Sequence, residues 1–74
     1  MLWIVNKDTS HQIMSCNVHR DKDDKGENIF QIWITRPNGK NLKLQESKNE
    51  NTIVTIKEAI DYAIEKNEKV LRLA

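Results

Sequence analysis

The segment from Asn28 to Thr35 constrains the fold most, because a run typical of a β-strand is followed at once by a turn. β-Branched and aromatic residues dominate this segment, as they do in strands. Residues 36–40 then contain a proline, an asparagine and a glycine, which favour tight turns. Leu42 and Leu44 alternate with polar residues after the turn and predict a returning strand. The sequence therefore predicts a β-hairpin at the centre of the fold.

The rest of the chain predicts three further strands and one helix. The strands are expected at residues 2–6, 12–19 and 70–73. Thr55 and Glu58 match a capping box, in which two side chains satisfy backbone N–H groups at a helix start. An apolar stripe with helical spacing follows and consists of Ile56, Ala59, Ile60, Ala63 and Ile64. We therefore predict an α+β fold for residues 1–74: a single compact domain with a small antiparallel β-sheet (ββββαβ) and one amphipathic helix packed on one face.

Strand alternation divides the predicted sheet into a face that meets the helix and an opposite face. The residues expected in the core are Met14, Cys16, Val18, Phe30, Ile32, Ile34, Leu42 and Leu44. The opposite face then receives Ile29, Gln31, Trp33 and Thr35, with Lys43 beside them. No second helix is predicted, so this face is expected to lie uncovered.

Two registers stay open at this point. In the first strand, either Leu2 and Ile4 or Trp3 and Val5 point inward. A shift of the hairpin by one residue would also move Trp33 into the core, because side chains alternate along a strand.

Charge and cysteine content narrow the class of protein. The net charge of +1 gives no overall attraction to nucleic acid or to a membrane surface. Residues 28–45, however, hold three bases and no acid, so the central hairpin is basic. A lone cysteine excludes an internal disulfide and favours a reducing compartment. Apolar runs are too short for a signal peptide or a membrane span, so a cytoplasmic location is expected.

Metal sites and catalytic groups are poorly supported by the sequence. Residues 21–26 resemble the start of a calcium loop, but Lys25 and Ile32 occupy positions that need oxygen ligands. Cys16 and His19 are expected on opposite faces of a strand, which does not suit zinc. No nucleophile with a fixed base and no glycine-rich phosphate loop is present. We therefore predict no enzymatic activity, no metal and no cofactor.

The uncovered face supports a function in protein binding. An outward tryptophan on a sheet is typical of a partner site, because its large apolar area is otherwise left in water. Ile29, Trp33 and Lys43, joined by Trp3, are the expected contacts. We therefore predict a protein–protein interaction or regulatory module of inhibitor or adaptor type, forming a homodimer through the sheet face opposite the helix.

Single-stranded nucleic-acid binding is the alternative. Such binding needs aromatic rings that stack on bases, together with cations that follow the phosphates. Trp33, with Arg36, Lys40 and Lys43, would supply both. Few aromatic residues and a balanced overall charge make this hypothesis weaker than protein binding.

Overall fold

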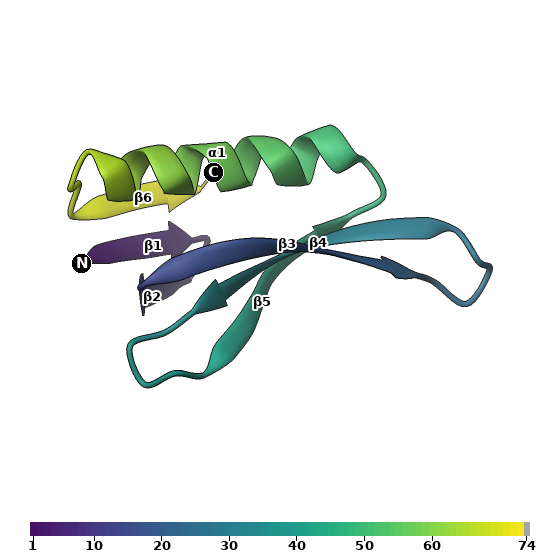
Figure 1. Cartoon of the computed structure of the whole chain (residues 1–74), viewed down its shortest axis with the longest axis horizontal. Helices are drawn as coiled ribbons and strands as arrows, with labels where there is room; N and C mark the ends of the chain where they lie inside the picture. The colour runs from purple at the N-terminus through teal and green to yellow at the C-terminus, as the bar shows by residue number, and fades with distance from the viewer. Residues whose placement is uncertain (74) are drawn as a thin grey trace.

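The computed structural model of the protein describes residues 1–73, which form six strands and one helix (Figure 1). The elements are β1 (Leu2–Asn6), β2 (Thr9–Ile13), β3 (Ser15–Lys22), β4 (Asn28–Thr35), β5 (Asn41–Ser47), α1 (Glu50–Glu65) and β6 (Val70–Leu73). The predicted α+β class is confirmed, as is the succession of strands, a single helix and a final strand. The second predicted strand is divided at Met14 into β2 and β3.

The strands form two three-stranded sheets, β2-β1-β6 and β3-β4-β5. All neighbours are antiparallel except β1 and β6, which are parallel. The chain passes from the first sheet to the second at Met14, whose N–H donates to the Thr35 carbonyl at 2.8 Å. Figure 1 shows α1 lying along one side of the strands, with the β3–β4 hairpin extending past the N-terminal end of the helix.

The bend at Met14 corrects one core prediction. Ile13 and Cys16 are both buried, whereas Met14 is 55% exposed. Two consecutive outward residues, Met14 and Ser15, therefore separate the buried positions. The strict alternation on which the prediction relied does not continue through such a break.

Both open registers are resolved by burial. Leu2 and Ile4 are 3% and 0% exposed, so Trp3 points outward from β1. Ile32 and Ile34 are completely buried, and Trp33 lies on the other side of β4. Val18, Phe30, Leu42 and Leu44 pack at the margin of the same buried cluster, as expected.

The helix begins before the predicted capping box. Asn49 is the N-cap, and its side-chain oxygen accepts a hydrogen bond from the Asn51 N–H at 3.0 Å. Thr55 consequently lies inside α1, exposed to solvent. Ile53 is completely buried and extends the apolar stripe toward the N-terminus of the helix. Along residues 1–73, no helix is long and apolar enough to cross a membrane.

Candidate functional site

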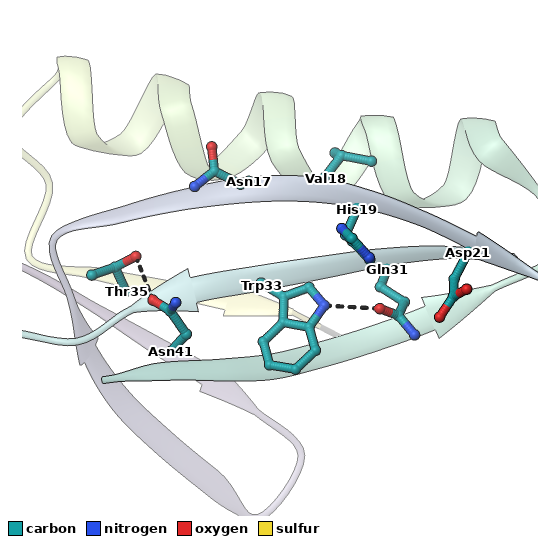
Figure 2. Close-up of a pocket in the computed structure, with 8 residues that line it drawn as sticks. All are labelled: Asn17, Val18, His19, Asp21, Gln31, Trp33, Thr35 and Asn41. Carbon is teal, nitrogen blue, oxygen red and sulfur yellow. Dashed lines mark hydrogen bonds between the residues drawn. The ribbon is translucent and has the colours of Figure 1, made fainter. Parts of the chain in front are cut away.

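The outer face of the second sheet is the candidate site. We use "outer face" for the side of β3-β4-β5 turned away from α1. Cross-strand pairs place Asn17 and Lys43 on either side of Trp33, and His19 beside Gln31. A shallow hollow of about 450 Å³ lies here, lined by Asn17, Val18, His19, Asp21, Gln31, Trp33, Thr35 and Asn41 (Figure 2).

A chain of hydrogen bonds holds Trp33 in place. The indole Nε1–H donates to Gln31 Oε1 at 2.9 Å, as Figure 2 shows. Gln31 Nε2 donates in turn to Glu46 Oε1 at 2.9 Å, and Lys43 Nζ donates to the same oxygen at 3.4 Å. Gln31 is only 7% exposed, and these hydrogen bonds satisfy both the oxygen and the nitrogen of its side-chain amide within the sheet. Because the indole N–H is already engaged, a partner would meet the apolar surface of the ring.

A β-bulge brings Glu46 into this network. Ile32 pairs with Gln45 and Trp33 pairs with Lys43, so Leu44 is an extra residue in β5. Lys43 and Glu46 therefore share the outer face, although they are three positions apart in a strand. The hydrogen bond from Gln31, and secondly the contact with Lys43, lower the pKa of the Glu46 carboxyl.

The structure places three of the four predicted contacts on one face, and of these only Trp33 lines the hollow. Ile29, Trp33 and Lys43 share the outer face through the alternation of β4 and the pairing with β5. Trp3 lies instead on β1, where it lines a separate hollow with Arg36. The basic residues predicted to assist Trp33 in nucleic-acid binding are thus divided: Lys43 is beside Trp33, and Arg36 is beside Trp3.

Sequence reasoning missed Glu46 as a member of the site. Glu46 begins a polar segment that reads as a surface connection, and no local signal marks the bulge that keeps it within β5. Asn17 and Asp21 were also missed, although the register of β3 against β4 would have placed them opposite Trp33 and Ile29.

The surroundings of Cys16 disfavour ionisation of its thiol. The side chain is 5% exposed, and its Sγ donates to Asp61 Oδ1 at 3.5 Å. Burial, and then the negative charge of Asp61, raise the pKa of the Cys16 thiol to about 12. Lys57 is held by Asp61 at 2.6 Å and only partly opposes this effect. The thiol is therefore neutral at physiological pH and unsuited to nucleophilic attack.

The acidic segment between β3 and β4 is a turn organised by Asp23. Its carboxylate accepts hydrogen bonds from the N–H groups of Lys25 and Glu27, both at 2.9 Å. The hydrogen bond from Glu27 is the largest cause of the lowered pKa of Asp23. Gly26 adopts a φ of 77°, which suits glycine. Across residues 1–73, no group of three or more His, Cys, Asp or Glu side chains is arranged to hold a metal ion.

No family model, curated protein or solved structure matches this chain. The geometry of the outer face is therefore the basis for a functional assignment.

Proposed function

We propose that this protein is a small interaction module of regulatory, inhibitor or adaptor type that self-associates through its outer face. The observation that carries the proposal is the position of Trp33. Its ring lies in an open hollow on the side of the sheet that α1 does not cover. A tryptophan held in a defined orientation is a typical centre of a protein interface, because it offers apolar area with little further loss of conformational freedom.

The charges on this face support a second copy of the chain as the partner. A two-fold symmetric interface places the same surface on both sides, so a surface of one sign would repel itself. The outer face carries Asp21 and Glu46 as well as Lys43. In a symmetric dimer, this face therefore meets an opposing surface that also carries both signs of charge.

The same charges favour protein over nucleic acid at Trp33. Lys43 is already paired with Glu46, with 3.4 Å between Nζ and Oε1. A phosphate chain following this face would approach Asp21 and Glu46, and each carboxylate opposes its binding.

The test is the oligomeric state of Trp33→Ala, with Trp3→Ala as the matched control. We expect the wild-type protein to be dimeric in light scattering after size exclusion. Trp33→Ala should weaken association by about 2 kcal/mol, roughly thirtyfold in affinity, while circular dichroism shows a folded chain. Trp3→Ala should leave the dimer intact.

Two results would overturn the proposal. A wild-type protein that stays monomeric at high concentration would exclude self-association. Equal weakening by both substitutions would show that the outer face is not the specific contact.

A further inference from the structure

A second hollow lies on the first sheet, about 330 Å³ in volume, and is centred on Trp3. We call it the Trp3 hollow. Its wall is built by β1, β2 and the turn after β4, which contribute Trp3, Gln12 and Arg36 respectively. Ser10 and Asn38 add a hydroxyl and an amide to the lining. Aromatic, cationic and hydrogen-bonding groups thus meet in one place.

The Trp3 ring is exposed because the adjacent residues of β1 occupy the buried positions. Leu2 and Ile4 fill the inward positions of β1, which leaves Trp3 outside and 44% exposed. Val70, its partner on β6, is also exposed, at 48%. An indole ring with a free surface is a platform on which a planar group can stack.

The positive charges near Trp3 come from Arg36, which lines the hollow, and from two residues outside the lining. Arg36 is half-buried, yet within residues 1–73 its guanidinium takes part in no ion pair. Lys40 lies on the same turn, and the Arg36 N–H donates to its carbonyl at 2.9 Å. Arg72 lies on the same sheet face as Trp3, since Leu71 and Leu73 on either side of it pack against the core. Among the described residues, no aspartate or glutamate lines the hollow.

From these observations we infer that the Trp3 hollow binds single-stranded nucleic acid. A base stacks on Trp3, and the neighbouring phosphates meet Arg36, Lys40 and Arg72. Ser10, Gln12 and Asn38 lie where they can hydrogen-bond to the edge of the base. This site uses a different sheet and a different tryptophan from the proposed dimer surface. The failure of one proposal would therefore leave the other unaffected.

The experiment titrates the protein with a fluorescein-labelled oligothymidylate of about eight nucleotides and follows fluorescence anisotropy. Trp3→Ala should weaken binding by about tenfold or more, the effect of losing one stacked base. Trp33→Phe, which retains an aromatic ring, is the matched control and should bind as the wild type does. Circular dichroism checks that each variant is folded.

Salt dependence gives a second readout. Contact with three phosphates predicts that the logarithm of the affinity falls with the logarithm of salt with a slope of about −2. Arg36→Gln should reduce the magnitude of that slope by about 0.7, the contribution of one cation on a single strand.

Three results would overturn the inference. Wild-type protein that does not bind the oligonucleotide at low salt would exclude the site. Binding that survives Trp3→Ala would be non-specific attraction, and binding lost in Trp33→Phe would belong to the outer face. Equal binding of polyglutamate would identify an acidic protein as the ligand in place of nucleic acid.

Discussion

The two tryptophans occupy surfaces of opposite character, although both point outward from a strand. Trp33 donates its indole N–H to Gln31, and Lys43 beside it is paired with Glu46. Trp3 is more open, and the nearby Arg36 forms no ion pair within residues 1–73. The contrast teaches that the cross-strand neighbours, rather than the tryptophan itself, determine what a surface can bind.

Both surfaces depend on one buried cluster. Ile4 from the first sheet, Ile32 from the second and Ile60 from α1 are all completely buried within it. The two faces therefore belong to one cooperative unit. Substitutions on either face can be compared with substitutions in the buried cluster that both faces share.

The largest effect is expected from Ile32→Ala. Removing a fully buried isoleucine side chain leaves a cavity and should lower the free energy of unfolding by about 2–5 kcal/mol. Urea unfolding should be followed in two single-tryptophan backgrounds, Trp3→Phe and Trp33→Phe. Both fluorescence signals should shift to the same lower midpoint. Separate midpoints would mean that the two faces unfold independently.

The next effect is expected from Gln31→Met, which keeps the side-chain volume and removes both hydrogen bonds. The indole N–H of Trp33 loses its acceptor, so stability should fall by about 1–3 kcal/mol. Self-association through the outer face should weaken, while nucleic-acid binding at Trp3 should stay unchanged. A variant as stable as the wild type would show that the hydrogen-bond chain does not hold the ring.

A smaller effect is expected at the start of α1, which supports both faces. Asn49→Ala removes the cap on the Asn51 N–H and should cost about 1 kcal/mol in thermal or urea unfolding. Thr55→Ala is the matched control, because Thr55 lies exposed within the helix. It should be neutral or slightly stabilising, since alanine favours helices more than threonine does. The reverse order of effects would place the helix start at Thr55.

The smallest effect is expected from pH acting on Glu46. Its pKa is lowered in the folded protein, so its stabilising contribution is present above the ordinary carboxyl pKa. That contribution should be lost as the pH falls through the lower native value. Glu46→Gln should therefore show a shallower loss of stability in this acidic range than the wild type. Identical pH profiles would mean that Glu46 does not stabilise the outer face.

Much of the fold could be predicted from local pattern. The hairpin could be predicted because β-branched alternation is followed directly by turn residues, and the uniformity of the apolar set favoured the register that buries Ile32 and Ile34. The start of α1 was less accessible, because Asn49 as a cap and Thr55 as a cap are both reasonable locally. Burial of Ile53 against the sheets is what favours the earlier start.

The candidate sites could be predicted only in part, because some of their residues meet through long-range pairing. Trp33 and Lys43 were assigned to one face by alternation within a single hairpin. Glu46 required knowledge of the bulge at Leu44, and the meeting of Trp3 with Arg36 required knowledge of how β1 and β2 lie against a turn more than twenty residues away in sequence.

The sequence by itself determined the α+β class and the central hairpin and favoured an outward Trp33, because these follow from periodicities set by local backbone geometry. Tertiary structure decided the bend at Met14, the bulge that turns Glu46 toward Gln31, and the placement of Arg36 beside Trp3. Each of these depends on which distant segments share the core and on how strands pair across the sheet. Such long-range pairing is the step that surrounds Trp33 with side chains of both charges and places Arg36 beside Trp3.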